Sequence, residues 1–180
     1  MRSCEYLSVG GQPRKTKRLR LRNLRFFRNG VEIPHSSNDL AHCDFLSITF
    51  EDQKNDMKND TITMHAASDE ILCPVKSWAR VVKRITQIKS HSPDTHVNTF
   101  SDNGKVFLVT SSDAMTALRS AAKTIGTQKL GFSPTEIGTH SIRSGAAMAM
   151  YLDEVPVYTI MLNGRWSSDA FLLYIRKQVE

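Results

Sequence analysis

The strongest constraint on the fold of this chain is a change in hydrophobic periodicity near Pro74. Before that residue, apolar and polar side chains alternate in short runs, as they do in β-strands whose two faces have different surroundings. After it, apolar residues recur at spacings of three and four, which is the period of an amphipathic helix. The order of the two patterns predicts an α+β fold in which a small antiparallel β-sheet is followed by a helical bundle.

The first expected strand covers residues 15–26, in which basic and apolar side chains alternate. A period of two puts Leu19 and Leu21 on one face and the intervening arginines on the other. We interpret the arginine face as solvated, with contact to phosphate groups left open; its members are Arg18, Arg20 and Arg22. The Arg-Asn-Gly turn at residues 28–30 predicts a hairpin that returns through residues 31–33.

Two further strands complete the expected sheet, at residues 45–50 and 60–64. The polar stretch at residues 53–59 is expected to join them as the tip of a hairpin. A short helix at residues 3–8 precedes the sheet, and it ends at the pair Gly10-Gly11 because glycine commonly terminates a helix.

Helices are expected through the part of the chain that follows Pro74. Proline is favourable at the first position of a helix. An apolar stripe at helical spacing comes next: Val75, Trp78, Val82 and Ile85. Capping residues, prolines and glycines then indicate the ends of further helices. One of them is expected to begin after the capping cluster at residues 111–113 and to end near residue 126, and the others are expected at residues 139–152, 156–164 and 167–177.

Composition narrows the possible classes of function. Lys and Arg outnumber Asp and Glu by 24 to 18, and the resulting formal charge of +6 favours a polyanionic partner without proving one. The cysteines at positions 4, 43 and 73 form no CxxC pair, so we expect no zinc site and a reduced, intracellular protein. No apolar run approaches the ~20 residues that span a bilayer, and we expect neither a membrane segment nor a signal peptide. The two ends of the chain are typical of a domain taken from a longer protein.

Three segments in the second half carry residues suited to chemistry. In the first, His140 and Arg143 are three residues apart, so a helix places them on one face. The second is the motif Gly164-x-Trp166, and the third is an apolar run around Tyr174. Each feature alone has an ordinary structural interpretation, such as a capping histidine, a paired arginine, or a core tryptophan or tyrosine. Their order and spacing together are more specific than any one of them.

Taken in order, these motifs resemble the second signature box of the tyrosine recombinase (phage integrase) family. Arg2, with Glu5 three residues later and a hydrophobic pair next, resembles the first box of that family. Lys54 lies on the expected hairpin tip, where the family carries a lysine, although Lys58 on the same stretch remains an alternative. The resemblance spans nearly the whole chain. The sequence of residues 164–176 is similar to that of recombinases of eukaryotic DIRS-like and crypton mobile elements.

The resemblance implies DNA cleavage through a 3′-phosphotyrosine, without a metal or another cofactor. Tyr174 would be the nucleophile, and Arg2 and Arg143 would neutralise charge on the phosphate with their planar donors. His140 would accept a proton or hold the phosphate, and Lys54 would protonate the departing 5′-oxygen. The implied catalytic residues are Arg2, Lys54, His140, Arg143, Trp166 and Tyr174.

Two departures from the family pattern concern Trp166. Many members have histidine at this position, whereas the tryptophan indole can donate one hydrogen bond but cannot carry a proton. We therefore assign Trp166 a positioning and stabilising role and leave His140 as the acid–base candidate. The step from Trp166 to Tyr174 is also one residue shorter than the commonest family spacing.

The sequence therefore leads us to expect a single catalytic domain over residues 1–180, without the N-terminal DNA-clamping (core-binding) domain of the family. The expected function is that of a site-specific recombinase or integrase acting on double-stranded DNA. The full-length protein would form a homotetramer on DNA. It would lie in the nucleus of a eukaryote, or otherwise in the cytoplasm or nucleoid. Two alternatives stay open: a type IB topoisomerase-like enzyme, and a recombinase-derived DNA-binding module without catalysis.

Overall fold

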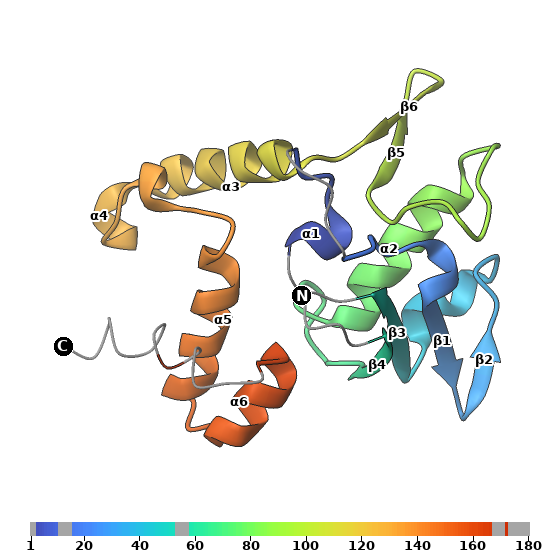
Figure 1. Ribbon diagram of the computed structural model, residues 1–180, viewed down its shortest axis with the longest axis horizontal. Helices are drawn as coiled ribbons and strands as arrows, with labels where there is room; N and C mark the ends of the chain where they lie inside the picture. Colours follow the sequence, from blue (N-terminus) through green and yellow to red (C-terminus); the bar gives the residue numbers. More distant parts are fainter. Residues whose placement is uncertain (1–2, 11–15, 53–57, 167–171, 173–180) are drawn as a thin grey trace. The chain divides into compact units, whose positions relative to one another are not determined.

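A computed structural model describes residues 3–10, 16–52, 58–166 and 172 of the chain (Figure 1). The described residues fall into two compact units. We call residues 4–110 the sheet unit, and the residues from Ser111 onward, together with Ser3, the helical unit. The secondary structure is mixed, with a small antiparallel sheet and several helices, so the predicted α+β class is confirmed.

The sheet unit is built on four antiparallel strands in the order β2-β1-β3-β4. Their bounds are β1 (Leu24–Arg28), β2 (Val31–Ile33), β3 (Phe45–Asp52) and β4 (Lys58–His65). The strands predicted at residues 45–50 and 60–64 are confirmed as β3 and β4, both somewhat longer than predicted. The tip between them, with Lys54, lies outside the described residues.

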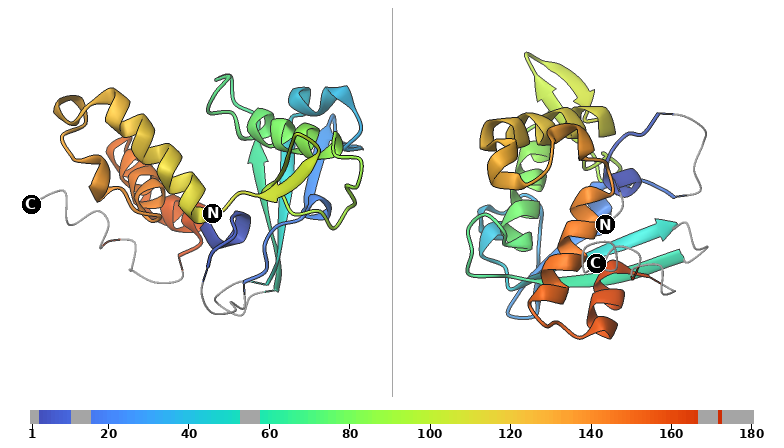
Figure 2. Two further views of the ribbon diagram at one scale, coloured as in Figure 1. Left: turned by 90° about the horizontal axis from the view of Figure 1, so that it is seen from above. Right: turned by 90° about the vertical axis from the view of Figure 1, so that its left-hand side faces the viewer.

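Alternation of side chains gives this sheet one buried face. Along β3, every second residue is buried, and the register pairs Phe26 with Leu46 and Leu24 with Ile48. Helix α2 (Pro74–Thr86) lies along the sheet (Figures 1 and 2) and buries Val75, together with other residues of the predicted stripe. Residues from the sheet and from α2 with at most 2% of their surface exposed are Leu24, Phe26, Leu46, Ile48, Phe50, Val75, Val82 and Ile85.

The hairpin turn between β1 and β2 is confirmed. Asn29 and Gly30 both have positive φ, at 50° and 76°. Two consecutive residues of this kind form the turn whose twist matches that of paired strands, and Asn-Gly is the pair that adopts it most readily. Arg28 and Val31 close the ladder on either side of the turn.

The predicted strand over residues 15–26 is only partly right. Strand β1 begins at Leu24, and residues Leu21–Asn23 form a 3-10 turn, η1. The side-chain oxygen of Asn23 accepts a hydrogen bond from the Arg20 backbone N–H at 2.8 Å. Such a local bond offers the backbone an alternative to a strand ladder. Leu19 and Leu21, which were predicted to share one face, are both buried, each with 2% of its surface exposed.

The remaining elements of the sheet unit are short. They are α1 (Ser3–Tyr6), which is shorter than the predicted helix at residues 3–8, the 3-10 turn η2 (Asn38–His42), and the hairpin of β5 (Thr99–Asp102) and β6 (Lys105–Leu108). This last hairpin was not predicted from the sequence. Its turn at Asn103-Gly104 has φ values of 48° and 75°, the same turn geometry as between β1 and β2.

The helical unit contains α3 (Ser111–Ile125), α4 (Thr127–Leu130), α5 (Ser141–Leu152) and α6 (Val157–Gly164), with a 3-10 turn, η3 (Pro134–Glu136), before α5. The predicted helices at residues 139–152 and 156–164 are confirmed within two residues. Helix α3 is also confirmed, but it begins at Ser111 and not after the capping cluster at residues 111–113. Helices α5 and α6 pack together (Figure 1). Ala147, Met148 and Ile160 form their buried apolar cluster, and Trp166 and Leu172 contact this cluster. The helix predicted at residues 167–177 lies outside the described residues except for Leu172.

No helix in the described part of the chain is long and apolar enough to cross a membrane.

The burial of the sheet unit's core predicts a clear difference between two isoleucines. Ile48→Ala should lower the free energy of unfolding by about 2–5 kcal/mol, because it removes apolar contacts and leaves a cavity. Ile71→Ala should change it by less than about 0.5 kcal/mol, because a surface substitution creates no cavity. The exposed fractions of the two side chains are 0% and 78%. Urea unfolding followed by circular dichroism measures both; equal losses would contradict the assigned core.

Candidate active site

Three of the predicted catalytic residues, His140, Arg143 and Trp166, lie within the described part of the helical unit. The other three, Arg2, Lys54 and Tyr174, lie outside the described residues. The candidate site therefore consists of the first three residues and the groups that hold them.

His140 immediately precedes α5 and is exposed. Its backbone is already helical, with φ −86° and ψ −17°, and its carbonyl accepts hydrogen bonds from the N–H and the hydroxyl of Ser144. Its side chain makes no capping hydrogen bond to the helix. The imidazole therefore does not cap the helix, although capping would be the ordinary structural explanation for a histidine at this position.

Arg143 joins α5 to the end of α6. Its Nη2 donates a hydrogen bond to the carbonyl oxygen of Gly164. The centre of its guanidinium lies 4.1 Å from the centroid of the Trp166 ring, which is close enough for a cation–π contact. The half-buried guanidinium is therefore held in one plane by a carbonyl and by an aromatic face.

The turn after α6 explains how Trp166 reaches Arg143. Arg165 adopts the left-handed conformation, with φ 53° and ψ 46°. Its N–H donates to the carbonyl of Leu162, and the N–H of Trp166 donates to that of Met161, both at 3.0 Å. This pair of bonds is the Schellman arrangement, which satisfies the last carbonyls of a helix and reverses the chain direction. The reversal brings the indole back over the end of α6.

Gly164 is required by the position of the indole. A Cβ atom on this residue would lie 1.6 Å from Cζ3 and 1.7 Å from Cε3 of Trp166. No side chain larger than hydrogen fits while the ring stays in place. The spacing Gly164-x-Trp166 thus has a direct physical reason: the glycine gives room to the ring, and the ring covers the arginine.

The end of α6 also favours a cation electrostatically. The last carbonyls of a helix carry a partial negative charge, and a positive side chain there is stabilising. Arg143 supplies that charge at Gly164. The same contact aligns the guanidinium before any ligand binds, and a charge fixed in advance is what a phosphate-binding site requires.

The region of the first signature box is partly described. Glu5 is completely buried, and its backbone carbonyl accepts a hydrogen bond from the N–H of Leu19 at 2.7 Å. Burial, and then the neighbouring Glu5 carboxylate, raise the pKa of the adjacent Tyr6 hydroxyl. This burial agrees with a structural role for Glu5.

Lys58, the alternative to Lys54, lies within the described residues. It is the first residue of β4, is exposed, and pairs across the ladder with Asp52. The Asp52 carboxylate lies 2.9 Å from the Lys17 amine, which is the main cause of its lowered pKa. Lys58 thus stands at the base of the hairpin tip, and the choice between Lys54 and Lys58 stays open.

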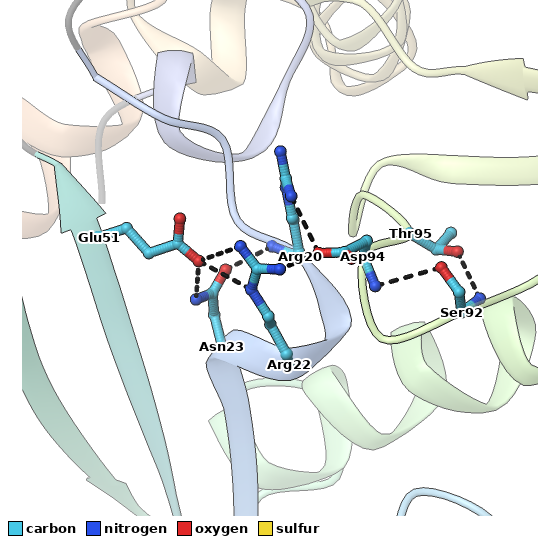
Figure 3. A network of polar contacts seen from close by, with 7 residues as sticks. All are labelled: Arg20, Arg22, Asn23, Glu51, Ser92, Asp94 and Thr95. Atoms are coloured by element: carbon cyan, nitrogen blue, oxygen red, sulfur yellow. Dashed lines mark hydrogen bonds and ion pairs between the residues drawn. The ribbon is translucent and has the colours of Figure 1, made fainter.

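Sequence reasoning missed the partners of the basic stripe. Arg20 and Arg22 were interpreted as solvated, but both contact Asp94, and Arg22 also contacts Glu51 (Figure 3). No local pattern could have indicated Asp94, which is 74 residues from Arg20.

Comparison with known proteins gives no relative: no family model, curated protein or solved structure matches this chain. Among the described residues, no three His, Cys, Asp or Glu side chains are grouped so as to hold a metal ion. The functional interpretation therefore depends on the residues of this chain and their contacts.

The fit between Gly164 and the Trp166 ring predicts opposite effects for two glycine substitutions. Gly164→Ala should displace the indole and lower the free energy of unfolding by about 1–3 kcal/mol, because it overpacks the site. Gly145→Ala, within α5, should leave stability unchanged or raise it by up to about 1 kcal/mol, since glycine disfavours helix interiors. A Cβ at Gly145 would meet nothing within 4 Å.

The measurement is Trp166 fluorescence and urea unfolding in a Trp78→Phe background, which leaves one tryptophan. An unchanged emission spectrum for Gly164→Ala would show that the ring does not rest on this residue.

Proposed function

We propose that this chain is the catalytic region of a site-specific DNA recombinase or integrase, which cuts and rejoins DNA through a 3′-phosphotyrosine at Tyr174. The observation that carries the proposal is the contact of Arg143 with both Gly164 and Trp166. It unites two segments of the motif that are separate in sequence and fixes a guanidinium in a half-buried position. The tyrosine recombinase catalytic-domain fold is part of the same proposal.

A fixed guanidinium is suited to the charge that develops in phosphodiester cleavage. As a nucleophile adds to phosphorus, negative charge gathers on the non-bridging oxygens. A guanidinium carries five N–H donors in one plane, so an arginine that donates to a carbonyl can still donate to phosphate oxygens. Arg143 would meet this charge together with Arg2.

The proposed reaction has two balanced steps. The phenolic oxygen of Tyr174 attacks phosphorus, a Tyr–O–P bond forms, and the bond from phosphorus to the 5′-oxygen breaks. His140 takes the phenolic proton, and Lys54, or Lys58 in the alternative, gives a proton to the departing oxygen. In the second step a 5′-hydroxyl attacks the phosphotyrosine and reverses these transfers. Covalent catalysis of this kind conserves the energy of the phosphodiester bond.

Trp166 supports this chemistry without moving a proton. Its indole N–H is a donor only, and its ring holds Arg143 in position. His140 therefore accepts the phenolic proton in the proposed reaction. Its imidazole is exposed and makes no helix-capping hydrogen bond.

The proposal includes the partner and the setting. The substrate is double-stranded DNA, and the full-length protein acts as a homotetramer on it, inside the cell. In a eukaryote the compartment is the nucleus; otherwise it is the cytoplasm or nucleoid. The surplus of 24 Lys and Arg over 18 Asp and Glu supports a polyanionic partner.

Trapping of covalent adducts tests the nucleophile. The wild-type chain, incubated with a random duplex pool and denatured in hot detergent, should retain DNA, whereas Tyr174→Phe should retain none, because phenylalanine has no oxygen that can bond to phosphorus. Tyr158→Phe, a matched control at an exposed position of α6, should behave as the wild type.

Other outcomes of this experiment separate the alternatives. Duplex binding without adducts in any variant would favour the non-catalytic DNA-binding module. Adducts that accompany relaxation of supercoiled plasmid without strand exchange would favour the topoisomerase-like enzyme. Equal adducts in wild type and Tyr174→Phe would exclude Tyr174 as the nucleophile.

Substitution of Arg143 tests the observation on which the proposal depends. Arg143→Lys should slow adduct formation by about 10²–10³-fold, because a lysine cannot bind a carbonyl, stack on an indole and meet two phosphate oxygens at once. Arg80→Lys, at an exposed arginine in α2 paired with Glu70, is the control and should leave the rate within about twofold of wild type. The rate is measured under single-turnover conditions; an unchanged rate in Arg143→Lys would remove this residue from the active site.

A further inference from the structure

Two arginines of the sheet unit converge on one oxygen atom. Nη1 of Arg20 and Nη1 of Arg22 both contact Oδ1 of Asp94, the former at 2.9 Å (Figure 3). The exposed fraction of the Asp94 side chain is 59%, so the carboxylate lies on the surface. A single exposed acidic oxygen thus receives hydrogen bonds from two guanidinium groups.

Arg22 is held from its inner side as well. Nε and Nη2 of Arg22 lie 3.0 and 2.9 Å from Oε1 of Glu51, whose side chain is 22% exposed. The amide of Asn23 donates to the same Glu51 oxygen at 3.1 Å, and its oxygen accepts from the Arg20 backbone. Glu51 and Asn23 therefore keep Arg22 in position whether or not Asp94 is in place.

Asp94 is not needed to tie the two backbone segments together. The backbone N–H groups of Leu21 and Arg22 each donate to carbonyls of residues 93–95 at 2.9 Å, and the N–H of Val97 donates to the Leu19 carbonyl at 3.1 Å. Exposed ion pairs contribute little to stability beside such a ladder. The Asp94 side chain is therefore the replaceable member of the cluster.

The two arginines make the surroundings of the Asp94 carboxylate positive. Hydrogen bonding to Arg20 is the main cause that lowers the pKa of the Asp94 carboxyl, and Arg22 lowers it further. Burial first, and then the charge of Arg18, lower the pKa of the nearby His96. A phosphodiester carries the same single negative charge as a carboxylate, so it can take the place of Asp94 in this field.

We propose that Arg20 and Arg22 form a contact site for the phosphate backbone of duplex DNA, and that Asp94 occupies this site in the free protein in place of a phosphate oxygen. The proposal deepens the function proposed above and rests on it for the choice of DNA as the partner. A phosphate group displaces Asp94, which turns to solvent, while Glu51 keeps Arg22 aligned. Asp94 acts as a built-in competitor that weakens DNA binding.

The test measures non-covalent binding of the 180-residue chain to a fluorescent duplex of random sequence. All variants carry Tyr174→Phe, so that no adduct forms. Asp94→Asn removes the competing charge, and Glu32→Gln is the matched control, because Glu32 is an exposed partner of Arg25 at the sheet edge and loses the same charge. Binding is followed between 50 and 200 mM salt.

At the lowest salt, Asp94→Asn should bind the duplex at least about threefold more tightly than Glu32→Gln. One neutralised phosphate changes the affinity by a similar factor between the lowest and the highest salt. Its plot of log K against log salt should be steeper by about 0.9 for each additional phosphate that the protein neutralises. Arg22→Gln should weaken binding and make the slope shallower by about 0.9, whereas Arg25→Gln should not.

Thermal unfolding of each variant verifies that it is folded, and Asp94→Ser replaces Asp94→Asn if the latter is not. Equal binding by the Asp94 and Glu32 variants, or no binding by any variant, would overturn this proposal. Tighter binding confined to duplex RNA would also overturn it.

The recombinase proposal has a separate readout, because adduct formation by the chain with Tyr174 intact does not depend on these variants. Tighter binding by Asp94→Asn without adducts from the wild type would support the phosphate site and reject the catalytic function.

Discussion

The guanidinium of Arg143 connects two segments that lie 21 residues apart in sequence. It donates to the last carbonyl of α6 and lies on the ring of the residue that follows the turn. Each partner depends on the other: without the reversal at Arg165 the indole would not return, and without a hydrogen at Gly164 it would have no room. The end of α6, the start of α5 and the apolar cluster between them are thus organised around one cation.

This arrangement also explains why tryptophan can stand where a proton-carrying residue would be expected. An indole offers a wide flat surface for a guanidinium and buries apolar area against Ala147, Met148 and Ile160. A histidine would provide a second ionisable group but less contact area. In the proposed mechanism, removal of the phenolic proton then falls to His140. Its exposed position before α5 leaves the imidazole accessible for that role.

Sequence reasoning succeeded where the determinants are local and failed where they are distant. The prolines, capping residues and glycines around α2, α3 and α6 predict these helices closely, and Asn29-Gly30 predicts the first hairpin. The pair Asn103-Gly104 is the same turn signal between β5 and β6, and this second hairpin could therefore have been predicted from the sequence. Strand β1 begins late because the side chain of Asn23 bonds to the backbone, which alternation does not encode. For the site, the motif predicts which residues cooperate, but only the fold shows that a carbonyl holds Arg143.

The two arginine clusters differ in how readily their partners can be exchanged. Two of the contacts that hold Arg143 are with a neutral carbonyl and an aromatic ring, and neither of these groups carries a charge that a phosphate would have to replace. Arg20 and Arg22 are held partly by a carboxylate at the surface, which a phosphate can replace. A catalytic group benefits from the first arrangement because its geometry must be the same before and after binding. A backbone contact suits the second, because exchange of one anion for another keeps binding reversible and sensitive to salt.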